Sequence, residues 1–410
     1  MMATTPKIRF NGFTDDWEQR KLGDVVENVY GGGTPKTSVQ EYWDGKIPWI
    51  QSSNVQEDQL FDVDIQKNIT EVGLEKSAAK LVPANSIAVV THVGVGKLVY
   101  MPFEYTTSQD FTSLSDLKTD AIFTCYSLYR RLQRDLHIVQ GSAIKGITKD
   151  DLLTKEIMIP DMEEQRKIGQ YFTNLDHLIT LHQRKSDKTK ELKNYMLQKM
   201  FPKKGKKNPE IRFEGFTDDW EQRKLIDYLE VSGEKNKDEA YGKEDVLSVS
   251  GEYGIVNQIE FQGRSFAGAS VANYGVVEAG DVVYTKSPLK SNPYGIIKTN
   301  KGKSGIVSTL YAVYKPKEIT YSKFVQIYFE LDSRMNSYMH PLVNKGAKND
   351  MKVSDENALK GPIIFPKLEE QKKISSYFEE LDNLITLHQR KCNELKELKK
   401  YMLQNMFPKK

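Results

Sequence analysis

Two stretches of the chain share one pattern of apolar residues, and this pattern constrains the fold more than any other feature. They run from Glu163 to Met200 and from Glu369 to Met406. Good helix formers fill them, and each would give a helical rod of roughly 55 Å. In the first stretch two series are spaced by seven and offset by three, which is typical of a helix packed along another helix. The series are Ile168, Leu175, His182, Thr189 and Met196, and Tyr171, Leu178, Lys185 and Leu192.

The two stretches are copies of each other, so each can supply the apolar partner that the other needs. Aligned from Ile157 and Ile363, they agree at 32 of 48 positions. We therefore expect an antiparallel coiled coil within the chain, and we interpret its stripe as the surface for coiling and partner docking. Our register hypothesis places His182 beside Leu384 and Leu178 beside His388. The residues assigned to the stripe are Ile168, Tyr171, Leu175, Leu178, Leu192, Ile374, Tyr377, Leu381, Leu384, Leu395 and Leu398.

A second repeat precedes each half of the chain. Pro6–Asp24 and Pro209–Asp227 are identical at 16 of 19 positions. In the first copy, Asp15 or Asp16 could cap a short helix that Trp17 anchors. Between the repeated segments lie two inserts, Val25–Glu156 and Tyr228–Pro362, with no evident similarity to each other. The pattern indicates an internal duplication in which the frame was kept and the inserts diverged.

These repeats predict an α+β fold with a pseudo-twofold internal repeat. Two α/β domains are expected to be separated by two long helices that form the antiparallel coiled coil. The expected segments are an N-terminal repeated segment (1–24), a first α/β domain (25–156), a first long helix (157–204), a linker with the second copy of the repeated segment (205–227), a second α/β domain (228–362) and a second long helix (363–410).

Composition indicates an ordinary soluble protein. Hydrophobic residues make up 39% and charged residues 28% of the chain, and no run approaches 18 apolar residues. The N-terminus lacks the apolar core of a signal peptide, so we expect a cytoplasmic protein without membrane contact. Two cysteines, Cys125 and Cys392, fit a reducing compartment and exclude a CxxC zinc site. A net charge of +3 does not by itself indicate nucleic-acid binding.

Each segment that resembles a catalytic motif lacks part of that motif. Gly31–Gly33 lacks the spacing of a phosphate-binding loop, and the glycines before Lys97 lack the rest of a Walker A motif. Asn292–Tyr294 resembles the box with which amino-methyltransferases hold a flipped base, but one proline and the cofactor loop are missing. We therefore expect no catalytic residue, no metal site and no cofactor bound by this chain.

A pair of similar helices that holds two unlike modules fits duplex DNA, whose backbone has twofold symmetry. Dimeric DNA-binding proteins place their reading elements about 34–36 Å apart, which the expected rod can span. Lysines in the inserts would contact phosphates, and polar side chains on their loops would meet base edges. The candidate DNA-binding residues are Thr91, His92, Lys97, Ser108, Gln109, Lys145, Lys286, Ser287, Lys290, Lys345, Lys348 and Asn349.

The chain closely resembles the specificity subunits of type I restriction-modification enzymes over essentially its whole length. The resemblance rests on the duplication, on the two WEQRKL segments, on GGGTPKTSVQEYWDGKIPWI, and on IPDMEEQRKI and IIFPKLEEQKKI before the long helices. It implies that each insert is a target recognition domain that reads one half of a bipartite DNA site. Ser108–Phe111 also resembles a polar-Gln-x-Phe segment that lies near DNA in the family, whereas the second insert has Val307–Thr309 in its place.

The resemblance also implies partners. The long helices would act as a ruler and as the docking surface for two modification subunits, which carry S-adenosylmethionine and methylate an adenine in each half-site. Restriction subunits would add translocation and cleavage driven by ATP and Mg²⁺. The alternatives are a coiled-coil scaffold whose globular ends bind protein, which the near-neutral charge favours, and a self-sufficient methyltransferase. DNA affinity that falls steeply with salt separates the first alternative from a DNA-specificity subunit.

Overall fold

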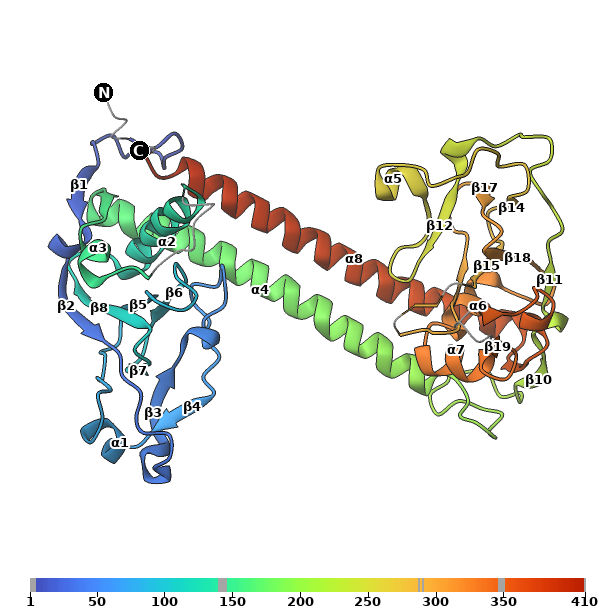
Figure 1. Ribbon diagram of the computed structural model, residues 1–410, viewed down its shortest axis with the longest axis horizontal. Helices are drawn as coiled ribbons and strands as arrows, with labels where there is room; N and C mark the ends of the chain where they lie inside the picture. Colours follow the sequence, from blue (N-terminus) through green and yellow to red (C-terminus); the bar gives the residue numbers. More distant parts are fainter. Residues whose placement is uncertain (1–4, 139–145, 287, 290, 346–350, 409–410) are drawn as a thin grey trace. The chain divides into compact units, whose positions relative to one another are not determined.

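The computed structural model describes residues 5–138, 146–286, 288–289, 291–345 and 351–408 (Figure 1). Its contacts divide the chain into two compact units. The first unit comprises Met1–His182 and Arg390–Lys410, and the second comprises Gln183–Gln389. Both boundaries fall inside the two long helices, α4 (Met162–Lys199) and α8 (Leu368–Asn405). Each unit therefore contains one half of each long helix, and we describe the units separately.

The long helices run antiparallel, which confirms the prediction. In the first unit Lys399 of α8 donates to Asp176 of α4, with 2.6 Å between Nζ and Oδ1. In the second unit Lys193 of α4 donates to Asp382 of α8, also at 2.6 Å. An early residue of each helix thus meets a late residue of the other. The start of α4 is capped by Asp161, whose Oδ1 accepts from the backbone N–H of Glu163 at 2.8 Å.

The register that we expected for the helix pair is wrong. Because Asp176 lies opposite Lys399, the residue opposite His182 is about nine positions beyond Leu384. The expected neighbours of Leu178 and His388 are displaced in the same way. The register is therefore marked by the ion pair Lys399–Asp176 and its counterpart Lys193–Asp382, rather than by the histidines.

One of the two predicted apolar series is also wrong in phase. Ile168, Leu175, Ile374 and Leu381 are buried as expected, but Leu178, Leu192, Leu384 and Leu398 are 40%, 44%, 44% and 41% exposed. The buried series lies one residue later and includes Phe172, Ser186 and Lys193 in α4, with Phe378, Cys392 and Lys399 at the matching positions of α8. A hydrophobic pattern selects leucines over Ser186 and Lys193 because both are polar. Lys193 is nevertheless buried, since Glu330 and Asp382 accept from its ammonium group.

The remaining residues of the predicted stripe are half-buried. Leu395 packs against the first unit's core. Tyr171 and Tyr377 lie against Phe10 and Phe213, with ring centroids 6.0 Å and 5.8 Å apart. These tyrosines thus contact the repeated segments.

Within the described residues, the first unit is built from short strands and three shorter α-helices in addition to its halves of α4 and α8. Its strands are β1 (Glu18–Lys21), β2 (Val26–Gly31), β3 (Trp43–Ile50), β4 (Lys67–Ile69), β5 (Ser86–Val90), β6 (Leu98–Met101), β7 (Thr106–Thr107), β8 (Phe111–Leu117) and β9 (Glu156–Ile159). Its helices are α1 (Glu71–Glu75), α2 (Ala121–Ile138) and α3 (Lys149–Leu153).

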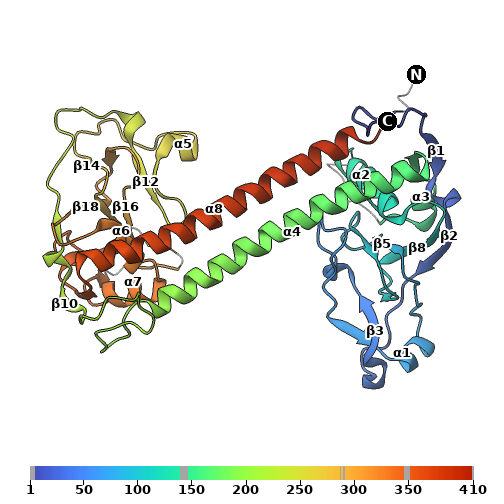
Figure 2. The same ribbon diagram turned by 180° about the vertical axis from the view of Figure 1, so that it is seen from behind.

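A four-stranded antiparallel sheet in the order β2-β8-β5-β6 forms the centre of the first insert. Helix α2 lies between this sheet and α4 (Figures 1 and 2), and Tyr126 of α2 packs on Phe172 of α4 with ring centroids 5.0 Å apart. A second sheet, in the order β4-β3-β7, forms a lobe together with α1. The lobe carries its own small core around Trp49 and Ile69.

The second unit has its own set of strands and helices. The strands are β10 (Glu221–Lys224), β11 (Leu229–Val231), β12 (Leu247–Ser250), β13 (Gly254–Asn257), β14 (Gly275–Val277), β15 (Val282–Thr285), β16 (Ile296–Thr299), β17 (Gly305–Val307), β18 (Tyr311–Pro316), β19 (Asn344–Lys345), β20 (Met351–Lys352) and β21 (Pro362–Phe365). The helices are α5 (Gln258–Gln262), α6 (Ser322–Tyr328) and α7 (Asp332–Met339).

The two inserts share a central sheet although their sequences show no evident similarity. The second insert has a four-stranded sheet in the order β11-β18-β15-β16, all antiparallel, which matches β2-β8-β5-β6 strand for strand. The burial pattern of short strands, rather than residue identity, is common to both. This correspondence allows loops of the two units to be compared directly.

The repeated frame makes the same contacts in each unit. β1 pairs with β9 and β10 pairs with β21, both antiparallel. Arg9 binds Glu164 at 2.7 Å and its counterpart Arg212 binds Glu370 at 2.8 Å. Trp17 packs on Phe407 in the first unit, where β1 replaces the short helix that we predicted, because residues 18–21 pair with β9.

Candidate nucleic-acid interface

Loops from three parts of the first insert meet at one end of its central sheet. Thr91 follows the last residue of β5, and its backbone N–H donates to Asp110 O at 2.7 Å. Its own carbonyl oxygen accepts from Ile147 N–H, also at 2.7 Å. The β5–β6 loop, the segment before β8 and the segment before α3 are therefore joined at Thr91.

The second insert repeats this junction. Lys286 follows the last residue of β15, and its backbone N–H donates to Leu310 O at 3.2 Å. Thr91 and Lys286 are thus equivalent, as are Asp110 and Leu310. Candidate residues that we selected separately in the two inserts fall on equivalent loops of the same sheet.

Two of the candidates in the first insert are structural. Thr91 is 1% exposed and its Oγ1 donates to Asp110 O at 3.1 Å. Ser108 is 3% exposed, and its Oγ donates to Asp110 Oδ2 at 3.2 Å. Both side chains hold the loop junction and are not accessible to a base edge.

Gln109 is exposed at the same junction and is available to a ligand. Its Oε1 accepts a hydrogen bond from Thr34 Oγ1 at 2.6 Å. Thr34 follows the glycine run Gly31–Gly33, whose spacing does not fit a phosphate-binding loop. Sequence reasoning missed this residue because the contact joins positions 75 residues apart.

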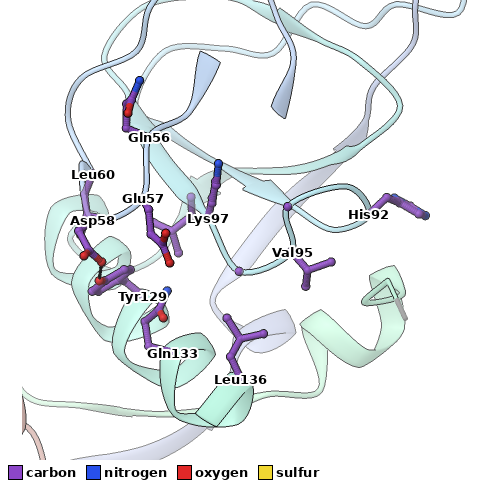
Figure 3. A pocket seen from close by; sticks show the side chains of 13 residues that line it. Gln56, Glu57, Asp58, Leu60, His92, Val95, Lys97, Tyr129, Gln133 and Leu136 are labelled. Carbon is purple, nitrogen blue, oxygen red and sulfur yellow. Dashed lines mark hydrogen bonds between the residues drawn. The ribbon is translucent and has the colours of Figure 1, made fainter. Parts of the chain in front are cut away.

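His92 and Lys97 lie on the β5–β6 loop, beside an open pocket of about 350 Å³ (Figure 3). His92 is exposed, whereas Lys97 is half-buried and its Nζ donates to Val55 O at 3.2 Å. Across the pocket, Tyr129 of α2 donates to Asp58. Burial and the Asp58 carboxylate raise the pKa of Tyr129 well above its usual range, so its hydroxyl remains a donor. The pocket is therefore lined by the positive Lys97 and by the acidic Glu57 and Asp58.

The second insert presents different side chains at the equivalent position. Lys286 forms an ion pair with Asp355 at 2.7 Å, so its charge is already compensated. Leu310, the counterpart of Asp110, is 62% exposed. Only the backbone of Lys345, in β19, is described. Lys145, Ser287, Lys290, Lys348 and Asn349 lie outside the described residues, and their roles stay predictions.

The family model of the type I restriction modification DNA specificity domain matches residues 14–191 and 217–397. The chain belongs to this family. Each match joins one insert to part of the frame, so the chain carries two copies of the specificity domain. Specificity subunits are generally non-catalytic components that work with DNA and with other subunits of the restriction-modification complex.

Individual specificity subunits are similar to parts of the chain or to its fold. The MjaIX specificity subunit of Methanocaldococcus jannaschii is 27% identical over 245 residues, which cover 54% of this chain and 53% of that subunit. The EcoR124I/EcoR124II specificity subunit of Escherichia coli is 28% identical over 191 residues, covering 42% and 46%. The chain thus spans about half the length of these two relatives. The crystal structure of the S subunit from M. genitalium has the same fold, with a TM-score of 0.62, 15% identity, and coverage of 99% and 100%.

Exposed leucines and tyrosines of α4 and α8 form a matching patch in each unit of this specificity-family chain. We call them the first and second helix patches. The first consists of Leu178, Leu181, Leu398 and Tyr401, which are 40%, 37%, 41% and 53% exposed. The second consists of the equivalent residues Leu384, Leu387, Leu192 and Tyr195, which are 44%, 43%, 44% and 51% exposed.

Each helix patch lies on one face of the helix pair. The leucines of α4 and α8 occur at the same angular offset from the residues that face the other helix. Because the helices run antiparallel, equal offsets point to the same side. Asp176 lies opposite Lys399, so Leu178 and Leu398 are also at nearly the same height. Each patch is therefore a contiguous apolar surface contributed by both helices.

The described residues include neither a group of potential metal ligands nor a helix that could span a membrane. Among them, no three His, Cys, Asp or Glu side chains are grouped as metal ligands. None of the helices within the described part of the chain has the length and apolar character needed to cross a bilayer.

Proposed function

We propose that this chain is the DNA-specificity subunit of a type I restriction-modification complex. Each insert recognises one half of a bipartite, asymmetric site in double-stranded DNA, and the chain itself performs no catalysis and binds no cofactor. The observation that carries the proposal is the contrast within the duplication. The Arg9–Glu164 pair of the first frame copy recurs as Arg212–Glu370 in the second, whereas the side chains at the equivalent loop junctions differ.

This contrast is what a reader of two different half-sites requires. The same sheet end presents Gln109 and Thr34 in the first insert and an exposed Leu310 in the second. Polar amides and apolar side chains contact different features of base pairs in the major groove. Two unlike surfaces on one frame therefore favour an asymmetric site over a palindrome.

Two modification subunits would dock on the chain, one on each helix patch. An exposed leucine cluster of this kind, flanked by polar residues, is typical of a protein interaction surface. S-adenosylmethionine would be bound by the modification subunits, which methylate adenine, and ATP and Mg²⁺ would act in restriction subunits. A cytoplasmic location follows from the DNA substrate and is part of the same proposal.

Docking can be tested with the chain coexpressed with its modification subunit and analysed by native mass spectrometry. Leu178→Ser with Leu398→Ser should remove one modification subunit, because it takes the apolar centre out of the first helix patch. Leu384→Ser with Leu192→Ser should remove one as well, and all four substitutions should remove both. Thr180→Ala with Lys400→Ala, at exposed positions away from the patches, is the matched control. Loss of both subunits from a single pair of substitutions, or of none, would contradict docking at the patches.

DNA binding distinguishes the proposal from a protein-binding scaffold. The complex with its modification subunits should bind a target duplex with an affinity that falls steeply between 50 and 200 mM salt, because phosphate contacts release counterions. Fluorescence anisotropy at three salt concentrations measures this slope. Absence of DNA binding at low salt, with the modification subunits bound, would favour the scaffold.

A further inference from the structure

The glycine run at Gly31–Gly33 has a steric role in the first insert. A Cβ atom on Gly32 would overlap the carbonyl oxygen of Ser108, and a Cβ atom on Gly33 would overlap the backbone of Ala78. A side chain at Gly32 would push the loop away from the segment before β8, and a side chain at Gly33 would push it away from Ala78. The glycines therefore bring two loops into direct backbone contact.

Hydrogen bonds hold the glycine run in this place. Gly33 N–H donates to Thr107 O at 2.8 Å, next to Ser108. Gly33 O accepts from the buried indole Nε1 of Trp49 at 3.0 Å. The backbone that leads into Thr34 is thus fixed to the core of the β3 lobe and to the segment that carries Gln109. Thr34 has a defined position relative to Gln109 before any ligand binds.

We propose that Thr34 is a positioning residue for base recognition by Gln109. The inference rests on the proposed function and deepens it. The Thr34 hydroxyl donates to Gln109 Oε1 at 2.6 Å. Because this contact occupies the oxygen end of the planar amide, we infer that the NH₂ end is directed away from Thr34 and outward from the junction. An outward amide N–H favours guanine, whose major-groove edge carries the acceptors O6 and N7, and thymine, which carries O4. Adenine has a single acceptor, N7, beside an amino group that needs an acceptor in turn.

An unrestrained glutamine would be less selective. A free side-chain amide can rotate and pair with adenine through both its donor and its acceptor. Restraint by Thr34 removes part of this freedom and orders the amide in advance, so less rotamer entropy is lost on binding. The GGGT segment therefore acts on specificity through Gln109, without itself contacting a phosphate.

The position of Thr34 separates this role from a role in folding. Thr34 and Gln109 are both exposed, and a hydrogen bond between exposed side chains contributes little to stability. Thr34→Val keeps the shape and removes the donor, so it should leave the melting temperature unchanged. In the second insert, Ser232–Glu234 follows β11 and takes the place that Gly32–Thr34 has after β2. The residue in the place of Thr34 is therefore Glu234, which pairs with Lys315 at 2.9 Å, so the half-site read by the second insert serves as an internal control.

The test uses the complex with its modification subunits and selects bound duplexes from a library randomised in both half-sites. The wild-type complex should enrich guanine or thymine at one position of the half-site read by the first insert. Thr34→Val should weaken this preference on the order of fivefold or more, because one well-formed base contact carries that much discrimination. Thr34→Ser should retain the preference, and the other half-site should be unchanged in both variants.

Gln109→Glu tests the direction of the amide. The carboxylate can still accept from Thr34 but has no hydrogen to donate, so the preferred base should change to cytosine or adenine, which carry amino groups. Equal selection by Thr34→Val and wild type would overturn the inference while leaving the proposed function intact. Loss of preference in both half-sites, or a lower melting temperature, would assign Thr34 a structural role instead. A wild-type complex that enriches no DNA sequence would overturn the proposed function itself.

Discussion

The two junctions between helix pair and insert use the same ion pair with a different third partner. In the first unit Asp176 accepts from Lys399 at 2.6 Å and from the Tyr126 hydroxyl at 2.7 Å. In the second unit Lys193 donates to Asp382 and to Glu330, both at 2.6 Å. The lysine and the aspartate belong to the repeated frame, and the third group comes from the insert.

The difference shows how one frame accommodates unlike inserts. A neutral hydroxyl completes the first junction, whereas the second contains two carboxylates and a second buried lysine, Lys298. Burial lowers the pKa of Lys298, and the nearby carboxylate of Glu330 opposes that shift. Burial also lowers the pKa of Lys193, but its two carboxylate partners outweigh burial and raise it overall. The frame supplies one pair, and each insert supplies the groups that satisfy it.

The largest expected effect comes from removing the frame lysine on each side. Lys193→Met removes the donor that Glu330 and Asp382 share, and should lower the free energy of unfolding by about 3 kcal/mol, the lower end of the range for a buried pair, because Asp382 is partly exposed. Lys399→Met leaves Asp176 with the Tyr126 hydroxyl and should cost less, about 1–3 kcal/mol. Urea unfolding followed by tryptophan fluorescence measures both. A loss that is equal at the two junctions, or larger for Lys399→Met, would contradict the comparison.

A smaller effect is expected from the neutral third partner. Tyr126→Phe removes one hydrogen bond to Asp176 and leaves its lysine in place, so it should cost about 1 kcal/mol. The same substitution combined with Lys399→Met should cost more than the two separately, because Asp176 then has lost both donors. Urea midpoints of the single and double variants provide the cycle. Strict additivity would show that the hydroxyl and the ammonium act independently.

The smallest effect concerns another position at which the two copies of the frame differ. Glu210 accepts from Lys199 and Lys203 at the end of α4, and these hydrogen bonds lower its pKa from 4.5 to about 2. The matching residue of the first copy is Lys7. A lowered pKa stabilises the fold above pH 4.5, and this contribution is lost as the pH falls toward 2. Glu210→Gln should therefore lower the urea midpoint at pH 7, where the charged form stabilises the fold, and leave it nearly unchanged at pH 2. An equal shift at both pH values would exclude the ion pairs as the cause.

The sequence predicted the frame well because the frame is local and repeated. The heptad spacing and the two copies were sufficient for a pair of long antiparallel helices, and the family resemblance was confirmed. The phase of one series was wrong because Ser186 and Lys193 occupy interior positions that a hydrophobic pattern assigns to leucine. Asp382 and Glu330, distant from Lys193 in sequence, make the burial of that lysine favourable.

The inserts could be predicted only in part. Strand pairs such as β5–β6 and β15–β16 follow from alternation and turn residues, but the sheet common to both inserts leaves no trace in residue identity. The candidate loops were found by their polar residues, and Thr91 and Ser108 proved to be buried within them. The contact of Thr34 with Gln109 depends on the packing of Gly32 under Ser108, which sequence spacing does not reveal.

The central claim is that two unlike readers on one duplicated frame each recognise one half of a DNA site. The most direct measurement exchanges residues 25–156 for the corresponding insert of another specificity subunit and maps methylated adenines in a cell that also expresses the modification subunit. The account predicts a new sequence in one half of the methylated motif, with the other half and the spacer unchanged. A motif altered in both halves, or not altered at all, would contradict it.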